Sequence, residues 1–303
     1  MRKNYYYFFI LLILTACHAP AEKQPANTVE NLIFITTDGL RWQEVFGGMD
    51  SSIAVMSKYN EGDSAYIFNK FWAADAATRR QKLMPFFWST LIENGQLYGN
   101  RREKSEVSTA NEFWFSYPGY NEMLTGYVDT NVNSNDHPHN KNVTVLEFLN
   151  QQPAIKGKVL AYGAWEATNR IINDERSGIM VGSGWRGFGG DKPSEKEKLL
   201  NNMLRDSYRP WGDVGGQDVF THYGAMVGLE ERKPKVLYIA YLETDEWAHA
   251  GKYRSYLDAT LQFDKYVQSI WEWVQSHPDY KDKTAIVIST DHGRGDKNKE
   301  QWT

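Results

Sequence analysis

Carboxylate and imidazole side chains follow three apolar runs of this 303-residue sequence. The carboxylates are Asp38, Asp245 and Asp291; His249 lies four residues after Asp245, and His292 directly follows Asp291. A lone aspartate after a strand usually caps a helix, but three at one sheet edge would repel one another unless a cation lay among them. Oxygen and imidazole ligands together suit Zn²⁺, with Mn²⁺ as an alternative and Ca²⁺ less suited. The pattern therefore predicts a site for divalent metal ions.

Ser116 is the candidate nucleophile. It precedes Pro118-Gly119, which we expect to break the chain, and then NEMLTG, which predicts a short helix ended by Gly126. A serine just before a helix is either an N-cap or a nucleophile at the positive helix N-terminus, where phosphate oxygens also bind. No histidine stands where a Ser–His pair would be expected, so a metal ion would have to activate the hydroxyl.

The elements that must position these side chains are predicted to form an α/β fold, with a mainly parallel central sheet and helices on both of its faces. Buried strands are predicted by four apolar runs, at 31–37, 158–165, 235–242 and 284–290. Helical spacing at 144–152 and 253–276 separates them, and strands alternating with helices favour parallel pairing. Ligands of such sheets bind at the carboxyl ends of the strands, where the acids stand. The Gly- and Trp-rich stretch 182–216 is predicted to be a loop-rich insertion over the site.

The first 17 residues have a basic start, an apolar stretch too short to span a bilayer, and small residues before Cys17. Leu-Thr-Ala-Cys resembles the lipobox of bacterial lipoproteins, and the alternative is an ordinary secretory signal with an incidental cysteine. We expect export, lipidation of Cys17, a flexible tether over 18–30, and a lipid anchor in the bacterial cell envelope. His18 after the cysteine resembles the sorting pattern for the outer membrane.

The net charge and the cysteine content argue against a nucleic-acid-binding protein and against a disulfide-stabilised fold. The net charge is -4 with no basic block, so a nucleic acid is not predicted as a partner. The single cysteine excludes a framework of disulfides within the chain.

Four blocks of the sequence occur in an order typical of one family. FITTDGLRWQEVF, SYPGYNEMLTG, LETDEWAH and STDHGRG together resemble the alkaline phosphatase superfamily, and the nearest branch is the type I phosphodiesterase/nucleotide pyrophosphatase group. The similarity runs from about residue 31 to the end, so it implies one catalytic domain over 31–303. Four ordered blocks are specific for the superfamily and much less specific for substrate.

The resemblance implies two metal ions. Asp38, Asp291 and His292 match the ligands of one ion, while Asp245 and His249 match two ligands of the other. Relatives supply one more histidine to the second ion, downstream of the Asp-His-Gly block. None follows here before the sequence stops, so we expect a truncated sequence whose third ligand would lie beyond it.

The resemblance also assigns roles around the nucleophile. Ser116 falls at the nucleophile position, where many relatives have threonine, and the first metal would bind it. Asn135 resembles the asparagine that hydrogen-bonds the transferring phosphoryl oxygen, and Asn133 or Asn140 could take that role instead. Tyr120 stands where a sulfatase needs arginine, which argues against a sulfatase.

The expected function is hydrolysis of small phosphomonoesters or phosphodiesters through a phosphoserine at a two-metal site. Two alternatives stay open: a non-catalytic metal- or ligand-binding lipoprotein of the same fold, and a transferase or mutase of phospho-groups. An acceptor pocket in 182–216 would favour transfer. The leaving group is expected to meet the aromatic middle of the chain, with Trp165, Trp185, Arg186 and Trp211.

Overall fold

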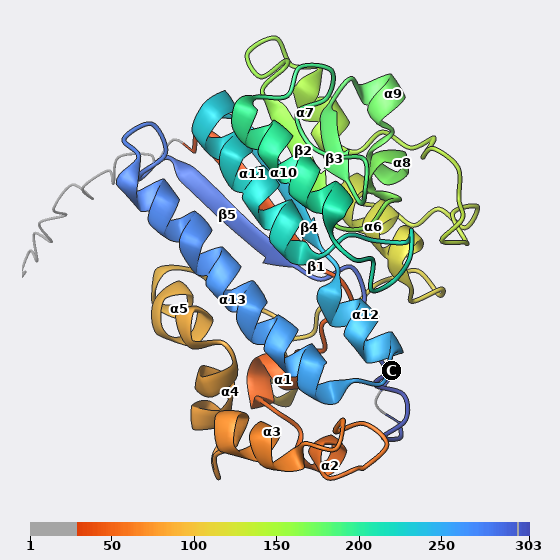
Figure 1. Cartoon of the computed structure of the whole chain (residues 1–303), viewed down its shortest axis with the longest axis vertical. Helices are drawn as coiled ribbons and strands as arrows, with labels where there is room; N and C mark the ends of the chain where they lie inside the picture. The colour runs from red at the N-terminus through yellow and green to blue at the C-terminus, as the bar shows by residue number, and fades with distance from the viewer. Residues whose placement is uncertain (1–28, 296) are drawn as a thin grey trace, which may run out of the picture.

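The computed structural model contains one sheet of five parallel strands in the order β3–β2–β4–β1–β5 (Figure 1). The strands are β1 (Asn31–Thr37), β2 (Val159–Gly163), β3 (Met180–Ser183), β4 (Val236–Tyr241) and β5 (Thr284–Ser289). The predicted α/β class with a parallel sheet is confirmed. The sequence did not predict β3, which is four residues long and contains a glycine.

The structure describes residues 29–295 and 297–303. The predicted lipoprotein signal and most of the predicted tether lie outside these residues. Within them, no helix combines the length and the apolar character that crossing a bilayer requires.

Helices occupy the connections between the strands. The α-helices are α1 (Trp42–Gly47), α2 (Ser51–Ala54), α3 (Ser64–Phe71), α4 (Ala76–Leu83), α5 (Ile92–Asn94), α6 (Ser116–Thr125), α7 (Val145–Asn150), α8 (Thr168–Ile172), α9 (Asp174–Ser177), α10 (Glu195–Asp206), α11 (Asp218–Arg232), α12 (Glu243–His249) and α13 (Tyr253–Ser276). A π-helical turn, η1 (Phe87–Leu91), and a 3₁₀ turn, η2 (Arg101–Glu103), complete the set.

Each face of the sheet buries its own apolar cluster. In β1, Ile33 and Ile35 face the cluster that includes residues of α11 and α13, whereas Leu32 and Phe34 face the cluster of α6, α7 and α8. This alternation follows from the two-residue period of a strand, and burial on both faces explains why the strands are nearly continuous apolar runs. β5 forms an edge of the sheet, and its Val287 is 45% exposed.

The stretch 182–216 contains a regular helix, so the prediction of a loop-rich insertion is wrong for α10. The helix begins at a capping box, in which Ser194 Oγ accepts from Glu197 N and Glu197 Oε2 accepts from Ser194 N. Leu204 buries against the core beside α11. A Ser-x-x-Glu start thus outweighs the loop-like composition around it.

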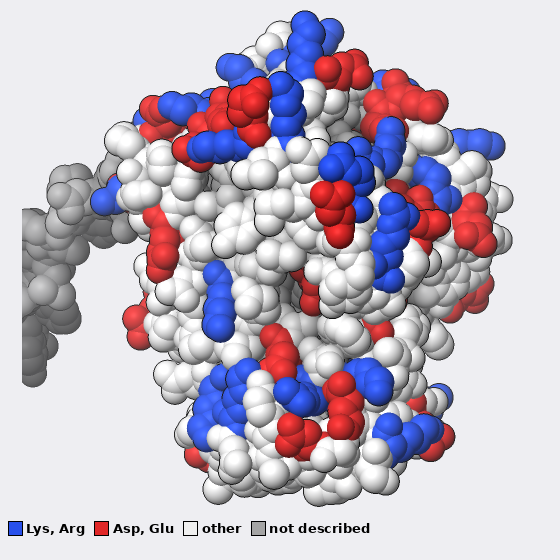
Figure 2. Space-filling model, viewed as in Figure 1, with Lys and Arg blue, Asp and Glu red and all other residues white. Residues whose placement is uncertain are grey.

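Charged side chains of both signs are interspersed over the face seen in Figure 2. Oppositely charged side chains of neighbouring helices also form ion pairs, such as Lys196–Glu230, at 2.7 Å between α10 and α11.

The last residues of the chain pack into an aromatic box. Trp302 is 0% exposed and contacts the rings of Tyr59, Tyr253 and Tyr256, with centroids 5.2, 5.1 and 5.8 Å away. These tyrosines belong to the loop after α2 and to the start of α13, so Trp302 holds the segment after β5 against the helical layer.

Candidate metal centre and nucleophile

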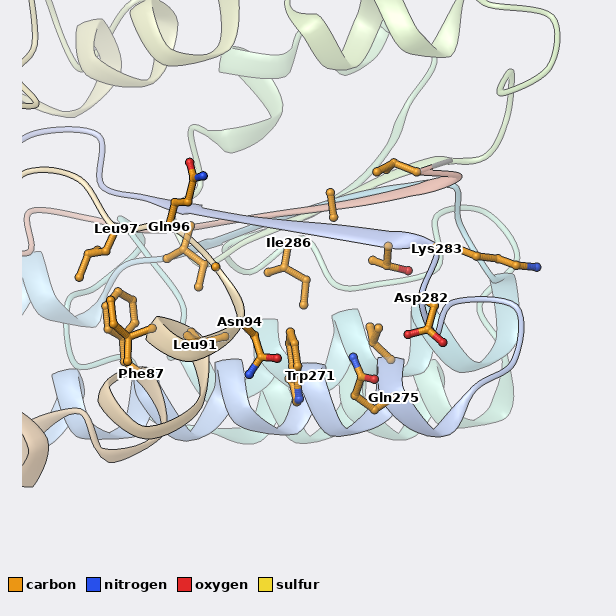
Figure 3. Close-up of a pocket in the computed structure, with 17 residues that line it drawn as sticks. Phe87, Leu91, Asn94, Gln96, Leu97, Trp271, Gln275, Asp282, Lys283 and Ile286 are labelled. Carbon is orange, nitrogen blue, oxygen red and sulfur yellow. The ribbon is translucent and has the colours of Figure 1, made fainter. Parts of the chain in front are cut away.

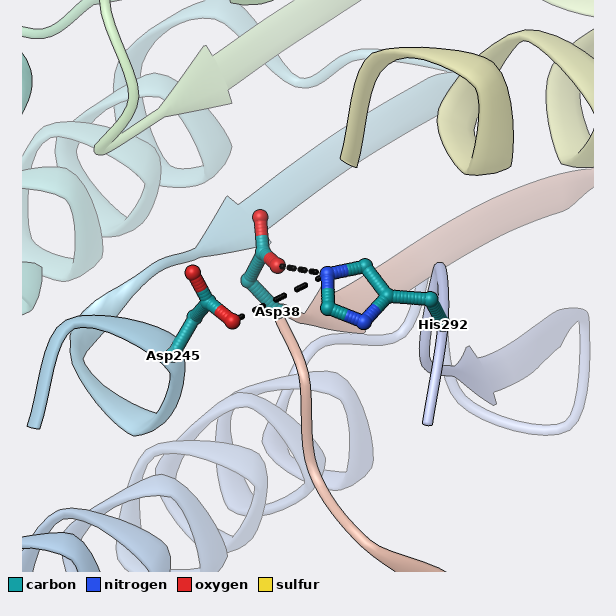
Figure 4. A group of neighbouring side chains, drawn as sticks. All are labelled: Asp38, Asp245 and His292. Carbon is teal, nitrogen blue, oxygen red and sulfur yellow. Dashed lines mark ion pairs between the residues drawn. The ribbon is translucent and has the colours of Figure 1, made fainter. Parts of the chain in front are cut away.

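Three buried side chains converge at the carboxyl ends of adjacent strands. Asp38 follows β1, Asp245 lies in the first turn of α12 after β4, and His292 follows β5 (Figure 4). His292 Nε2 is 3.2 Å from Asp38 Oδ1 and 3.7 Å from Asp245 Oδ1. One ligand atom from each residue lies within 4.8 Å of the others, so the three could share a metal ion.

Asp291 and Ser116 complete the cluster. Asp291 Oδ2 lies 3.6 Å from His292 Nε2, and its Oδ1 accepts the Gly39 amide at 3.1 Å. Ser116 Oγ lies 3.4 Å from both Asp38 Oδ1 and His292 Nε2. The structure therefore brings together most of the predicted ligands with the predicted nucleophile.

Burial and mutual repulsion shift the pKa values of these acids. Burial, followed by the charge of Asp245, raises the pKa of Asp38; burial and Asp38 hold the pKa of Asp291 well above its usual range. Burial would lower the pKa of His292, but Asp291, Asp38 and Asp245 outweigh it and raise the pKa to about 10. The raised pKa values of Asp38 and Asp291 follow from the burial of several carboxylates close together.

Four atom separations at the first predicted metal site are close to those around a tetrahedral ion. Ligand atoms bound to Zn²⁺ at about 2.0–2.1 Å lie roughly 3.3 Å apart. His292 Nε2 lies 3.2 Å from Asp38 Oδ1 and 3.6 Å from Asp291 Oδ2, and Ser116 Oγ lies 3.4 Å from both Asp38 Oδ1 and His292 Nε2. Asp291 Oδ2 is buried without a hydrogen-bond partner among the described residues, which is a costly arrangement unless a cation meets it.

The second predicted site fits less well. Asp245 Oδ2 lies 3.1 Å from His249 Nε2, as expected for two ligands of one ion, but the His249 side chain is 62% exposed. The other oxygen, Asp245 Oδ1, is bonded to the guanidinium of Arg294. Burial would raise the pKa of Asp245, but the His249 hydrogen bond and the charges of Arg294 and His292 lower it. Asp245 is thus already compensated by positive groups of the protein.

Ser116 is the first helical residue of α6, so the predicted start of this helix after Pro118-Gly119 is wrong. The N-cap is Phe115, and Ser116 is not the capping residue. Proline is tolerated in the first turn because an amide there has no acceptor within the helix. The predicted end at Gly126 is confirmed by its left-handed φ of 78°.

A glycine sets the distance between α6 and the loop after β5. A Cβ on Gly119 would lie 2.4 Å from the carbonyl oxygen of Asp291. Any other residue there would push apart the helix that carries Ser116 and the loop that carries Asp291.

Asn135 lines the pocket beside Ser116, and its Oδ1 accepts the Tyr117 amide at 2.9 Å. It therefore fixes the first turn of α6 as well as standing near the place expected for a phosphoryl group. The competing Asn140 is fully buried and bonds Asn121 Oδ1 and the Asn142 amide, so its role is structural.

Three residues that form hydrogen bonds with the aspartates of the site were not predicted. The Tyr120 hydroxyl donates to Asp38 Oδ2 at 3.1 Å, and the Thr244 hydroxyl donates to the Asp38 carbonyl at 2.5 Å. Tyr120 lies four residues after Ser116, so helical spacing could have found it. Arg294 stands within the STDHGRG block, but no sequence pattern predicted its partner.

A cavity of about 930 Å³ opens beside Ser116. Its aromatic side is formed by Trp42, Phe113, Trp114 and Phe115, and its polar side includes Arg294. None of its lining residues belongs to 182–216, but Trp211 of that stretch packs against Trp247 of α12, with ring centroids 5.2 Å apart. The place of the leaving group stays a prediction. Of the tryptophans expected there, Trp165 is buried in the core.

A second cavity, of about 450 Å³, lies between β5, α13 and the segment around α5 (Figure 3). Side chains such as Phe87, Leu91, Trp271 and Ile286 make its lining largely apolar. None of the candidate site residues lines it, whereas Ser116, Asn135, His249, Asp291 and His292 line the first cavity.

No family model matches this chain, and no curated protein matches it either. The family resemblance and the functional roles therefore stay predictions.

Proposed function

We propose that this chain is a metal-dependent phosphoric ester hydrolase of the alkaline phosphatase superfamily that acts through a phosphoserine at Ser116. The observation that carries the proposal is the placement of Ser116 Oγ, 3.4 Å from both Asp38 Oδ1 and His292 Nε2 at the start of α6. A buried serine beside Asp38 and His292 is placed to share a cation with them, which is how a metal ion activates a hydroxyl nucleophile.

The chain's own groups support an in-line displacement. Ser116 Oγ forms a bond to phosphorus as the bond from phosphorus to the leaving oxygen breaks. The hydroxyl of Ser116 donates to Asp38 Oδ1, 3.4 Å away, so this carboxylate is the acceptor for its proton. Water then cleaves the phosphoserine, which releases the phosphate product and restores Ser116.

The start of α6 offers few free amide donors to the non-bridging oxygens of the phosphoryl group. The Tyr117 amide already donates to Asn135, Pro118 has no amide hydrogen, and the Gly119 amide donates to Phe115. The Ser116 amide and the positive end of α6 therefore carry this role, with the side chain of Asn135 beside them.

A divalent ion held by Asp38, Asp291, His292 and Ser116 would supply the positive charge that activates the hydroxyl and neutralises the phosphoryl group. The ligand set suits Zn²⁺ best, with Mn²⁺ as the alternative. The substrate we propose is a small phosphate ester whose leaving group enters the aromatic side of the cavity. An anchor through lipidated Cys17 is proposed from the sequence alone.

The test uses the chain loaded with Zn²⁺ or Mn²⁺ and two chromogenic substrates, p-nitrophenyl phosphate and bis(p-nitrophenyl) phosphate. Ser116→Ala should abolish turnover of both and leave the binding of the first metal equivalent nearly unchanged. Ser183→Ala, which alters a buried serine of β3, is the matched control and should keep full activity. Acid quenching during turnover should trap a phosphoryl group on Ser116. Hydrolysis that survives Ser116→Ala would refute the nucleophile.

A second candidate is a metal-binding lipoprotein of the same fold that does not catalyse. The pairing of Asp245 with Arg294 favours it, because this contact removes a ligand atom from the second metal. Ser116→Ala and the unchanged chain would then be equally inactive, and no phosphoserine would form.

A further inference from the structure

We propose that the guanidinium of Arg294 takes the place of the second metal ion beside Asp245, so that the chain binds one divalent ion tightly rather than two. The inference rests on the metal centre proposed above. It concerns a residue for which neither the four sequence blocks nor the proposed mechanism gives a role.

Arg294 contacts Asp245 twice. Its Nη2 donates to Asp245 Oδ1 and, at 3.2 Å, to the backbone carbonyl of the same residue. Only 4% of the Arg294 side chain is exposed, so the pair lies out of solvent rather than on the surface. His249 holds the remaining oxygen, Oδ2, at 3.1 Å. Both oxygens of this carboxylate therefore already have partners.

The fold keeps a space for this pair. Gly39, which follows Asp38, has a φ of 59°, and a Cβ there would lie 2.4 Å from Asp245 Oδ1 and 3.0 Å from Arg294 Nη2. A side chain at position 39 would thus occupy the volume where the guanidinium meets the carboxylate. The missing side chain at Gly39 leaves room for Arg294. The left-handed φ of the turn after β1 independently favours a glycine at this position.

Charge also favours a single metal ion. Asp38, Asp245 and Asp291 all have an oxygen within 3.7 Å of His292 Nε2. A guanidinium is permanently protonated, so Arg294 neutralises one of the three carboxylates. With His292 as a neutral ligand, two negative charges remain, and one divalent ion balances them. A second ion would have to displace Arg294 from a buried contact and would then lie beside its charge.

The experiment counts metal ions and does not depend on turnover. The full chain is stripped with a chelator, titrated with Zn²⁺ alone, and examined by native mass spectrometry and calorimetry. We expect one tight equivalent for the unchanged chain. Arg294→Gln should bind a second equivalent at least tenfold more tightly than the unchanged chain does. Arg294→Lys should resemble the unchanged chain, since it keeps the charge.

Arg186→Gln is the matched control, because it removes an arginine from a half-exposed pair with Asp174 far from the site in sequence. It should leave the metal count at one. If Arg294→Gln does not fold, Arg294→Met, which keeps the aliphatic stem, replaces it.

Two results would overturn the inference: two tight equivalents on the unchanged chain, or a second equivalent that binds no more tightly in the folded Arg294→Gln or Arg294→Met variant. Either of them leaves the proposed function standing. A chain that binds no Zn²⁺ at all would instead overturn the proposed metal centre together with the inference.

Discussion

Removal of the indole of Trp302 should destabilise the whole domain even though this residue is next to last. The side chain is 0% exposed and lies edge-on to Tyr59, Tyr253 and Tyr256. Trp302→Ala would leave a hole between three rings and would release the segment that follows the candidate site. The effect should therefore reach both stability and the placement of Arg294.

The magnitude follows from burial. An aromatic side chain of this size buries about 150–250 Å², which contributes about 4–6 kcal/mol at about 25 cal/mol per Å². The indole Nε1 has no hydrogen-bond partner among the described residues, so its removal returns about 1–3 kcal/mol. The expected net loss is about 3 kcal/mol, at the low end of the range measured for tryptophan truncations. For a domain of this size, that loss lowers the melting temperature by roughly 6–12 °C.

The assay is thermal unfolding followed by circular dichroism, with two comparison variants. Trp302→Phe keeps much of the ring contact and removes the unpaired donor, so its loss should stay below about 1.5 kcal/mol. Trp114→Ala removes the same residue type at a position that is 69% exposed, and should change stability by no more than about 0.5 kcal/mol. If Trp302→Ala melts within 2 °C (about 1 kcal/mol) of the unchanged chain, the packing argument is refuted.

Three further predictions concern the site and the core. Zn²⁺ at 100 times its Kd should stabilise the chain by about 2.7 kcal/mol in thermal melts, whereas Asp291→Asn should lose most of this gain; equal gains would contradict the ligand assignment. Gly119→Ala should reduce kcat about 100-fold by separating Ser116 from the Asp291 loop, while Gly293→Ala, whose Cβ would meet nothing within 4 Å, should stay near the unchanged rate. Burial lowers the pKa of His222 to about 4, below its value in the unfolded chain. The contribution of the neutral, buried imidazole to the free energy of unfolding is therefore fully present above about pH 6.5 and is lost as the pH falls toward 4. Urea unfolding at pH 7 and 4.5 should reveal a loss of up to about 3 kcal/mol that His222→Gln reduces; equal losses in both proteins would contradict it.

Much of the sheet follows from the sequence because its strands are buried on both faces. Continuous apolar runs predict β1, β2, β4 and β5 to within two residues, and the spacing at 253–276 predicts the bounds of α13. β3 has no such signal, since two of its four residues are glycine and serine and its pairing with β2 depends on tertiary context.

The candidate site likewise has residues whose placement the sequence predicts and residues whose placement it does not. Asp38, Asp245 and Asp291 could be predicted to converge because parallel strands end at one edge of a sheet. The partner of Arg294 could not be predicted, because the contact depends on a side-chain conformation and on the space beside Gly39, far away in the sequence. The start of α6 differs from the prediction because Pro118 lies in the first turn of the helix and does not break it.

The position of β1 in the sheet determines when the chain can fold. β1 pairs on one side with β4 and on the other with β5, so that Leu32 lies opposite Val236 and Ala285. Both partners are synthesised more than 200 residues later, which takes roughly 10–40 s at translation rates of about 5–20 residues per second. During that interval the run NLIFITT has no strand to pair with and is a segment for chaperones to hold. This interior strand of the sheet therefore waits for partners that are encoded far downstream of it.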